Sequence, residues 1–528
     1  MTYEAPAELS ARWSHEGLTT DMTLAEAFAA AAQTRPAAQI SIASDHRSAS
    51  ASLAEVFEVA QRIAGGLQGI GVAPGDVVAV QTPNWLETVI AHAAIALAGA
   101  VILPIVHIYG RAEVEYILRQ SSAKVLITPD HWRGSDYIDR VAQLRGGLPD
   151  FKHVVVGDAP AGAVAWSQLA DHAPIEAIAA GDASAVALLI YTSGTTSDPK
   201  GVQHSHRTLL AELNAAPDRD PDQTALSPWP PGHVAGVLAL GRFWLLGRPA
   251  VLMERWDAAD AARLIERYRI TATAGTPFHL SSLLDAADAG GIDLSSLSNY
   301  LAGATMIPPS LIARCSERGL RTYRSYGLSE HPTISRGAPE DALEKRLTTD
   351  GRLCPGVEVM IVDDDGRALP LGEAGEILSR GPERFLGYRD PKLNDGVLLP
   401  GGWLRTGDIG KMDADGFLAI TDRKKDIIIR GGENIASREV EDILMTLPGV
   451  REAAVVGMPH PTLGEKVCAF LVAEPSADLS QERVSAHFKA KGVARQKTPE
   501  RVMLIEDLPR NAAGKVLKPI LREQLKAG

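Results

Sequence analysis

One polar stretch, Tyr191–Val202 (YTSGTTSDPKGV), constrains the fold of this chain more than any other. The apolar run Ala187–Ile190 before it is typical of a buried strand, and leucines at helical spacing follow from about His206. A strand–loop–helix of this kind is a good anion site, because small residues let backbone N–H groups approach a ligand and Lys200 adds a positive charge. The hydroxyl groups that can donate further hydrogen bonds belong to Thr192, Ser193, Thr195, Thr196 and Ser197.

The stretch is not a Walker A loop, because that pattern ends in Gly-Lys-Ser/Thr and the order here is Pro199-Lys200-Gly201. Ser, Thr, Gly and Asp also favour ordinary surface turns, so composition alone leaves a polar turn as an alternative. The prediction of a phosphate site therefore depends on what the rest of the chain carries.

Helical and strand patterns alternate over residues 1 to about 180, which predicts an α/β fold with a parallel sheet. The pattern becomes strand-rich from Gly351 to Ile377, which predicts a β-barrel-like subdomain, and the chain after about residue 423 is typical of a compact α/β domain. The early helices are expected at Leu24–Ala32, Leu53–Ile70 and Ala112–Ser121, and the early strands at Val77–Gln81 and Lys124–Thr128.

Composition limits the class of protein. At 528 residues with 45% apolar content, the chain predicts two or more folded domains. A net charge of −12 argues against non-specific nucleic-acid binding. The three cysteines, Cys315, Cys354 and Cys468, have no disulfide or zinc spacing, and the amino terminus lacks a secretory pattern. Both features favour a cytoplasmic location.

The apolar segment Val89–Ile108 is long enough to span a bilayer. It is rich in alanine, however, and contains two histidines, Gly99 and Pro104. A helix from about Trp85 to Leu97, a stop at Gly99 and a buried strand Ala100–Pro104 explain it equally well, so we expect no transmembrane segment.

Further motifs follow in order along the chain. The string Arg324–Glu330 (RSYGLSE) combines a glycine turn with a hydroxyl and a carboxylate, as a nucleotide–metal site requires, because a carboxylate repels a triphosphate unless a cation lies between them. Asp408 within Trp403–Gly410 (WLRTGDIG) is suited to a ribose diol. The other strings are Gly303–Pro308 (GATMIP), Asp422–Asp426 (DRKKD), Gly431–Ile435 (GGENI) and Pro509–Lys515 (PRNAAGK).

Together these strings resemble the signatures of adenylate-forming enzymes, the superfamily of acyl-CoA synthetases, adenylation domains and luciferases. The resemblance spans nearly the whole chain, although Ser197 and Asp422 stand where the family commonly has glycine. It implies a large AMP-binding domain over residues 1–422, with mixed parallel sheets and the β-barrel-like subdomain, and a small mobile α/β cap domain over residues 423–528, with a hinge near Lys425.

The resemblance also implies the roles of individual residues. ATP would be bound by Thr192, Ser193, Gly194, Thr195, Thr196, Lys200, Gly303, Ala304, Ser325, Tyr326, Gly327, Ser329, Asp408, Arg423 and Lys515. Lys515, Lys200 and Glu330 would be catalytic, with Glu330 holding Mg²⁺. The acid would lie against His233, Phe278, Ala302 and His331, and coenzyme A against Gly431, Gly432 and Glu433. A lone histidine beside an apolar helix, such as His233, is also commonly structural.

The implied reaction is ATP-dependent activation of a carboxylic acid through an acyl-adenylate, followed by transfer to coenzyme A. The expected pocket segments are mostly apolar, which favours a fatty, aromatic, alicyclic or steroid-derived acid. Three alternatives stay open: loading of a carrier-protein thiol, a nucleotide-binding protein without activity, and peripheral membrane attachment through Val89–Ile108. We expect an oligomer, and a dimer first.

Overall fold

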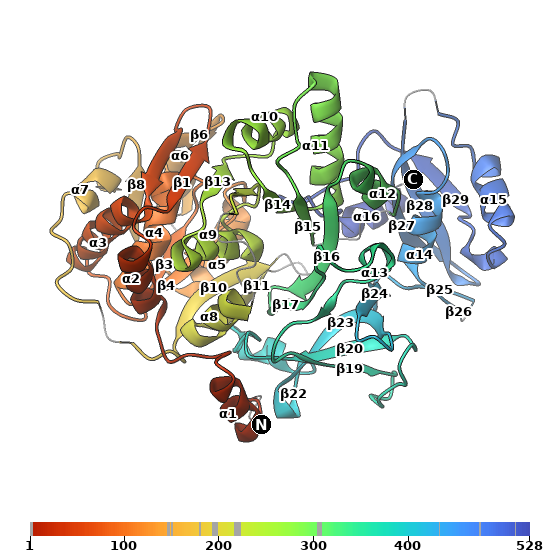
Figure 1. Ribbon diagram of the computed structural model, residues 1–528, viewed down its shortest axis with the longest axis horizontal. Helices are drawn as coiled ribbons and strands as arrows, with labels where there is room; N and C mark the ends of the chain where they lie inside the picture. Colours follow the sequence, from red (N-terminus) through yellow and green to blue (C-terminus); the bar gives the residue numbers. More distant parts are fainter. Residues whose placement is uncertain are drawn as a thin grey trace.

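The computed structural model describes residues 4–144, 148, 151–178, 181–192, 199–215, 223–303, 309–431, 433–474, 477–512 and 514–527. Two large sheets and a smaller antiparallel sheet form the amino-terminal part of the molecule, and a fourth sheet forms the carboxy-terminal part (Figure 1). The mixed α/β architecture and the smaller carboxy-terminal domain confirm the predicted fold class.

The first large sheet has nine strands, parallel in its middle and antiparallel at both ends. Its strands, in spatial order, are β18 (Arg352–Leu353), β17 (His331–Arg336), β16 (Arg321–Leu328), β15 (Asn299–Ala302), β14 (Ala272–Gly275), β12 (Ala225–Ser227), β13 (Ala250–Met253), β1 (Gln39–Ala43) and β2 (Ala49–Ser52). The β16–β17 hairpin carries the motif Arg324–Glu330 at its turn.

The second large sheet has eight strands, of which β4, β3, β5 and β8 form a parallel core. Its strands, in spatial order, are β21 (Gly387–Tyr388), β11 (Lys200–Ser205), β10 (Val186–Thr192), β4 (Val101–Pro104), β3 (Val77–Val80), β5 (Val125–Pro129), β8 (Lys152–Val156) and β9 (Val164–Ala165). Strands β3, β4 and β5 are buried at every position, and β8 is buried except at Lys152, as expected for parallel strands covered on both faces.

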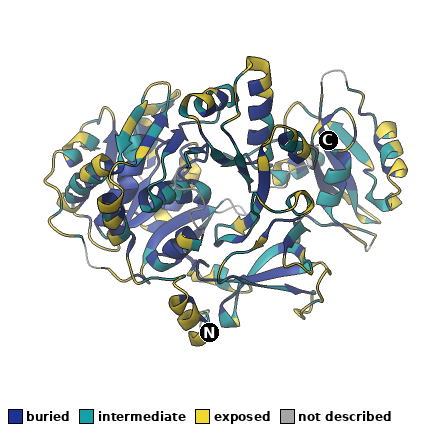
Figure 2. Ribbon diagram, in the orientation of Figure 1, coloured by how far each residue is buried: buried dark blue, intermediate teal, exposed yellow. Residues whose placement is uncertain are grey.

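The largest apolar core joins the two large sheets through the helices between them. These helices are α2 (Leu24–Thr34), α3 (Leu53–Gly69), α4 (Leu86–Leu97), α8 (His206–Ala215) and α9 (Val234–Leu246). Other helices cover the outer faces: α5 (Arg111–Ser121) and α6 (Tyr137–Leu144) on the second sheet, and α10 (Ala258–Tyr268), α11 (Pro277–Gly290) and α12 (Pro309–Glu317) on the first. Buried residues concentrate in the strands and inner helix faces (Figure 2).

Local sequence explains where the helices begin. Thr23 and Ser52 each form a capping box, with Glu26 and Glu55 respectively, at the start of α2 and α3. Thr276 caps α11 and is followed by Pro277 in the first turn, where proline's fixed φ suits a helix and its missing N–H costs no hydrogen bond.

The predicted strand-rich subdomain is a five-stranded antiparallel sheet, comprising β19 (Glu358–Val362), β20 (Gly375–Arg380), β23 (Trp403–Met412), β22 (Leu398–Leu399) and β24 (Leu418–Arg423). The small carboxy-terminal domain has its own sheet of β25 (Ile428–Arg430), β26 (Glu433–Ile435), β27 (Val450–His460), β28 (Gly464–Ala473) and β29 (Arg501–Leu504). Helices α14 (Ser437–Leu444), α15 (Gln481–Ala490) and α16 (Lys518–Ala527) complete it. Residues 424–427 alone separate the two sheets.

One local prediction was wrong. The loop after β10 does not lead directly into a helix, because the strand β11 pairs antiparallel with β10 before α8 begins at His206. The loop therefore closes a hairpin in which Thr192 faces Lys200. Burial along Lys200–Ser205 does not alternate, and this short run is too polar to stand out as a strand in the sequence.

The apolar segment Val89–Ile108 is divided between α4 and β4, as expected. Gly99 breaks it with φ +74°, a left-handed conformation that favours glycine. No helix in the described part of the chain is both long and apolar enough to cross a bilayer.

Trp244 offers a test of the core around α9. Its side chain is buried and stacks on Phe28 of α2 at 5.0 Å between ring centroids. Trp244→Ala is expected to lower the free energy of unfolding by about 3–5 kcal/mol, because it leaves a large cavity. Urea unfolding followed by circular dichroism measures this, with Trp244→Phe as the matched control that keeps the ring stack. If Trp244→Ala lowers the free energy of unfolding no more than Trp244→Phe does, the packing of Trp244 in this core is contradicted.

Candidate active site

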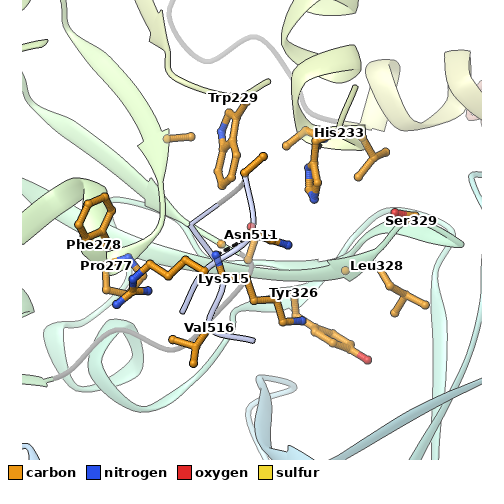
Figure 3. A pocket seen from close by; sticks show the side chains of 18 of the residues that line it. Trp229, His233, Pro277, Phe278, Tyr326, Leu328, Ser329, Asn511, Lys515 and Val516 are labelled. Atoms are coloured by element: carbon orange, nitrogen blue, oxygen red, sulfur yellow. Dashed lines mark hydrogen bonds between the residues drawn. The ribbon is translucent and has the colours of Figure 1, made fainter. Parts of the chain in front are cut away.

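A cavity of about 2140 Å³ lies where the two large sheets, the third sheet and the small domain meet. Trp229 and His233 point into it from one side, and the Asn511–Lys515 segment of the small domain approaches from the opposite side (Figure 3). The sequence motifs, far apart along the chain, therefore converge on one site. Predicted residues that line it are Thr192, Lys200, His233, Phe278, Gly303, Ser325, Tyr326, Gly327, Ser329, Glu330, Asp408, Arg423, Lys425 and Lys515.

The polar loop between β10 and β11 opens at this cavity, since Thr192 and Lys200 at its two ends both line it. Lys200 Nζ lies 5.4 Å from the centre of the Tyr388 ring on the neighbouring strand β21. Ser193, Gly194, Thr195 and Thr196, which were predicted to bind phosphate, lie outside the described residues, as does Ala304.

Glu330 is held at the turn of the β16–β17 hairpin. The Tyr388 hydroxyl donates to Glu330 Oε1 at 2.6 Å, and burial together with the Glu330 charge raises the pKa of Tyr388. Next to it, the imidazole of His204 bonds the Ser329 carbonyl oxygen at 2.8 Å. Burial lowers the pKa of His204 to about 4, so it is neutral and donates this bond through Nε2–H. These contacts tie the hairpin to the strands beside the polar loop.

Asp408 lies between two partners. The Tyr326 hydroxyl donates to Asp408 Oδ2 at 2.8 Å, and Arg423 Nε lies 2.9 Å from Asp408 Oδ1. Arg423 and Asp408 are also paired across β23 and β24. The carboxylate is thus held in a fixed orientation at the cavity wall, with lone pairs left for two further donors.

Lys515 stands on a short loop whose backbone is fixed by Asn511. The Lys515 N–H donates to Asn511 Oδ1 at 2.9 Å, and the Asn511 N–H donates to the Lys515 carbonyl at 2.9 Å (Figure 3). Burial, followed by the nearby charge of Arg423, lowers the pKa of Lys515 to about 7. The ammonium group is therefore poised to gain or lose its proton near neutral pH.

The loop seats against the amino end of α11. Gly514 has φ +77°, and a Cβ atom there would lie 3.1 Å from Thr276 Oγ1, so only glycine fits without a shift. Arg510 donates to the Gly514 carbonyl at 2.8 Å and to Glu452 at 2.7 Å, and its guanidinium lies 5.1 Å from the Phe278 ring centre. Phe278 thus contributes to the contact between the domains as well as to the cavity wall.

His233 caps α9 and faces the cavity. Its Nδ1 accepts from the Ala235 N–H at 3.2 Å, and its ring stacks on Trp229 at 5.8 Å between centroids. Burial, with a contribution from the Lys515 charge, lowers the pKa of His233 to about 4. Because Nδ1 is the acceptor, the neutral ring carries its proton on Nε2.

Two predicted pocket residues do not line the cavity. His331 is fully buried and bonds Ser379 Oγ at 2.9 Å, with Glu383 at 3.4 Å. Ala302 packs in the apolar core behind the first sheet. The prediction followed sequence proximity to the motifs, but side chains alternate faces along a strand, so neighbours of a cavity residue point away from it. Pro332 and Thr333 line the cavity instead of His331.

The predicted coenzyme A residues lie outside the cavity in this arrangement. Gly431 turns the β25–β26 hairpin with φ +60°, and Glu433 is exposed, where it accepts from Gln496 Nε2 at 2.5 Å. Gly432 lies outside the described residues.

The sequence analysis missed Tyr388, Trp229, Asn511, Arg242 and Arg336, which all line the cavity. Asn511 stands within the motif Pro509–Lys515, and Trp229 stands close to His233 in the sequence, so proximity to predicted residues was a usable signal. Tyr388 and the two arginines carry no local pattern, because only the folding of the two sheets brings them to the site.

The turn at residues 424–427 connects the domains, and Asp422 fastens one side of it. Asp422 Oδ2 accepts from the Ser437 N–H at 2.6 Å, at the amino end of α14 in the small domain. Its Oδ1 accepts from the Arg423 N–H at 2.7 Å. Arg522 and Asp426 form a further ion pair at 2.7 Å. The aspartate that replaces the usual glycine thus makes a bond between the domains.

Comparison with known proteins places this geometry in a family. The AMP-binding enzyme family matches residues 28–389, and the AMP-binding enzyme C-terminal domain matches residues 439–515. The chain is 35% identical over 526 residues to the medium-chain fatty-acid–CoA ligase of Escherichia coli, covering 98% of this chain and 92% of that protein. It is 37% identical over 502 residues to the 3-[(3aS,4S,7aS)-7a-methyl-1,5-dioxo-octahydro-1H-inden-4-yl]propanoyl:CoA ligase of Mycobacterium tuberculosis, covering 91% and 95%.

Among solved structures, the anthranilate CoA ligase AuaEII in complex with anthranoyl-AMP superposes with a TM-score of 0.87 at 25% identity, covering 96% of this chain and 97% of that one. The chain therefore belongs to the AMP-binding enzyme family and is a ligase of the adenylate-forming class, with an adenine nucleotide as the ligand of the site. The resemblance inferred from the motifs is confirmed.

Asp422 gives a prediction about how the domains are held. Asp422→Ala removes the acceptor for the Ser437 N–H, a loss of about 0.5–2 kcal/mol by analogy with other helix caps. Trypsin is then expected to cut after the exposed Lys424 or Lys425 roughly 2- to 30-fold faster, because the turn opens more often. Asp422→Asn, whose amide oxygen still accepts, is the control and should change the rate little. Equal cutting of Asp422→Ala and wild type would show that this bond does not restrain the turn.

Proposed function

We propose that this chain joins a hydrophobic carboxylic acid to coenzyme A at the expense of ATP, through an enzyme-bound acyl-adenylate, with release of pyrophosphate and AMP. One observation carries the proposal. Lys515 of the small domain lies in the same cavity as Lys200, Glu330 and Asp408 of the large domain, which is the set that adenylation requires.

The chemistry explains why cations gather here. A carboxylate is a poor acyl donor, and attack of its oxygen on the α-phosphorus of ATP converts it into a mixed anhydride while pyrophosphate leaves. No residue of the protein needs to form a covalent bond. Lys515 is proposed to bridge the incoming carboxylate and the α-phosphate, and Lys200 to neutralise the departing phosphates. A thiol then attacks the acyl carbon and AMP leaves.

Asp408 and Tyr326 are proposed to hold the nucleoside. Asp408 would accept the two ribose hydroxyls, and its existing bonds to Tyr326 and Arg423 orient it for that task. Gly303 and Ser325 line the same side of the cavity, where the adenine would lie.

Mg²⁺ fits this site through Glu330. Within the described residues no cluster of three or more His, Cys, Asp or Glu side chains could hold a metal. A single carboxylate is nevertheless enough for Mg²⁺ in a nucleotide site, since phosphate oxygens and water complete its shell. Glu330 keeps one oxygen for this purpose while Tyr388 occupies the other. The ion would supply charge neutralisation on the phosphates.

Apolar side chains support the proposed acid class. Leu226, Leu238, Leu252, Leu301 and Leu328 line the cavity beyond His233. The relatives are named for a medium-chain fatty acid and for a propanoate attached to a bicyclic, two-ketone ring system. Loading of a carrier-protein thiol is the alternative acceptor reaction and shares the first half-reaction.

The second half-reaction is proposed to follow a rotation about Lys425, with residues 1–422 and 423–528 as the moving units. The rotation would withdraw Lys515 and bring Gly431, Gly432 and Glu433 to the cavity to receive coenzyme A. The proposed assembly is a cytoplasmic dimer, as expected from the sequence.

The proposal is tested by measuring pyrophosphate release from ATP and Mg²⁺ with a panel of fatty, alicyclic and aromatic acids, with and without coenzyme A. We expect release with one chemical class, and a CoA thioester plus AMP when coenzyme A is present. Pyrophosphate without a CoA thioester would assign the thiol to a carrier protein. No release with any acid, while ATP still binds, would contradict the proposal.

Lys515→Ala is expected to reduce pyrophosphate release by at least about 100-fold, because a preorganised charge on the transition state is lost. Thioester formation from a synthetic acyl-adenylate should stay within about threefold of wild type, since Lys515 leaves the cavity for that step. Separate single-turnover assays of the two half-reactions measure this. Equal loss in both would contradict the assigned role.

The pKa of Lys515 predicts a pH dependence. Lys515 must be protonated to neutralise phosphate, and its pKa of about 7 in the free enzyme means that the charged fraction falls as pH rises through this value. The kcat/KM for ATP in adenylation is therefore expected to decrease by about tenfold per pH unit above about pH 7. Lys515→Arg, which stays charged, should retain a low activity without this decrease. A wild-type profile that stays flat to about pH 9 would overturn the interpretation.

A further inference from the structure

The cavity continues well beyond the proposed reaction centre, and its far end differs chemically from its middle. One face of α9 lines it throughout: Val234, Ala235, Leu238, Ala239 and Arg242. His233 caps this helix beside Lys515, and Arg242 lies roughly 13 Å further along the helix axis. The opposite wall is β17, which begins beside Glu330 and ends with Arg336 roughly 17 Å away along the strand.

The middle of the cavity between these walls is apolar. It is lined by Leu226, Leu238, Leu252, Ala274, Leu301 and Leu328. Leu238 belongs to α9, and the other five belong to strands of the first sheet. Beyond these residues the lining changes to Arg242, Arg336 and Thr333. A substrate made only of hydrocarbon beyond its carboxylate could not form hydrogen bonds with the polar side chains at this far end.

The donors at the far end are not fully paired with acceptors. Arg242 Nη2 lies 3.7 Å from Glu212 Oε1, and Thr333 Oγ1 donates to the same oxygen at 2.7 Å. Arg336 lines the cavity beside them, and in the part of the chain that the structure describes its guanidinium forms neither a hydrogen bond nor an ion pair within bonding distance. In the described part of the chain Glu212 Oε2 has no hydrogen-bond partner, and neither has either carboxylate oxygen of Glu383, a second buried carboxylate close to Glu212. Two guanidinium groups thus lie near two buried carboxylates without being fully paired with them.

Glu212 cannot balance this charge fully. It is fully buried, and burial raises its pKa to about 7 despite the attraction of Arg242. The neighbouring Arg248 also lines the cavity, and it already donates to Gln223 Oε1 at 3.1 Å. The far end therefore carries the guanidinium groups of Arg242, Arg248 and Arg336, next to the apolar lining of the middle.

We propose that the acid carries an oxygen acceptor, a ketone or a second carboxylate, at the end remote from the carboxylate that is activated, and that Arg336 with Arg242 binds it. This inference rests on the proposed function and specifies its substrate class. An arginine offers a planar fork of donors that suits a carboxylate or carbonyl oxygen. A site built to hydrogen-bond a polar group also discriminates strongly against analogues that lack it, because its buried donors are then left unpaired.

At each of several chain lengths, the test compares three acids that have the same number of carbons. These are the plain fatty acid, its derivative with a ketone on the penultimate carbon, and the α,ω-dicarboxylic acid. Pyrophosphate release and CoA thioester formation are measured for the wild type, Arg336→Gln and Arg336→Lys. Arg318→Gln is the matched control, because Arg318 forms an ion pair with Asp288 at 2.7 Å on the surface. Thermal unfolding of each variant establishes that it is folded.

We expect wild-type kcat/KM for a ketone or dicarboxylic acid to exceed that for the plain acid of the same length by about tenfold or more. Arg336→Gln should lower kcat/KM for the acceptor-bearing acid by about 10- to 100-fold and leave the plain acid within about threefold. The kcat/KM of Arg336→Lys for the acceptor-bearing acid should lie between the values of the wild type and Arg336→Gln. The kcat/KM values of Arg318→Gln should match those of the wild type. A larger loss for the dicarboxylic acid than for the ketone would identify a second carboxylate as the group bound.

An equal loss of activity on all three acids, or a wild-type preference for the plain acid, would overturn the inference and leave the proposed function standing. Failure of every acid to release pyrophosphate would overturn both. If Arg336→Gln does not fold, Thr333→Val in the same wall provides the second variant, and the same selective loss is expected of it.

Discussion

The seating of the Lys515 loop against the amino end of α11 is the contact on which the site depends. Gly514 approaches Thr276 so closely that a side chain would separate them, and Arg510 links the loop to Glu452 of its own domain and to Phe278 of the other. Without this contact the large domain would hold a nucleotide in a cavity that lacks the cation proposed for the reacting carboxylate. The active arrangement is therefore a property of two domains, and no single motif contains it.

Charge imposes the second constraint. The chain carries a net charge of −12, yet its ligand is a polyanion, so positive charge must be concentrated locally. Lys515, Arg423 and Lys425 meet at one wall, with Asp408 and Asp426 beside them. Burial is the main cause of the lowered pKa of Lys515 in the free protein, and repulsion by Arg423 and Lys425 adds to it. A bound phosphate would offset this repulsion. In the proposed mechanism, a group that is destabilised in the empty site and stabilised in the filled one would couple closure of the small domain to nucleotide binding.

The sequence predicted the parts of the site that lie within single motifs. Lys200, Glu330, Asp408, Arg423 and Lys515 all line the cavity, and each stands within a short motif whose pattern is local. Asp408 lies within strand β23, and the others lie in turns or at strand ends. The sequence could not predict positions that depend on which face of a strand is buried. His331 and Ala302 follow motifs closely, but the pleat turns His331 toward Ser379 and Ala302 into the core. Likewise β11 was missed, because its pairing with β10 and β21 is a tertiary contact between polar residues.

The two halves of the cavity are built in different ways, and this explains how one fold can take different acids. In the proposed nucleotide half, Asp408 of strand β23 and Glu330 of the β16–β17 turn are each fixed by a tyrosine hydroxyl, so a substitution there disturbs several contacts at once. The proposed acid half is walled by one face of α9 and by Pro332, Thr333 and Arg336 of β17. The other face of α9 packs in the largest apolar core, and β17 is held by its pairing with β16. Residues such as Arg242 and Arg336 can therefore change without disturbing the sheets. In the proposed function, the fold supplies the chemistry, and a few side chains at the far end of the cavity determine which acid is bound.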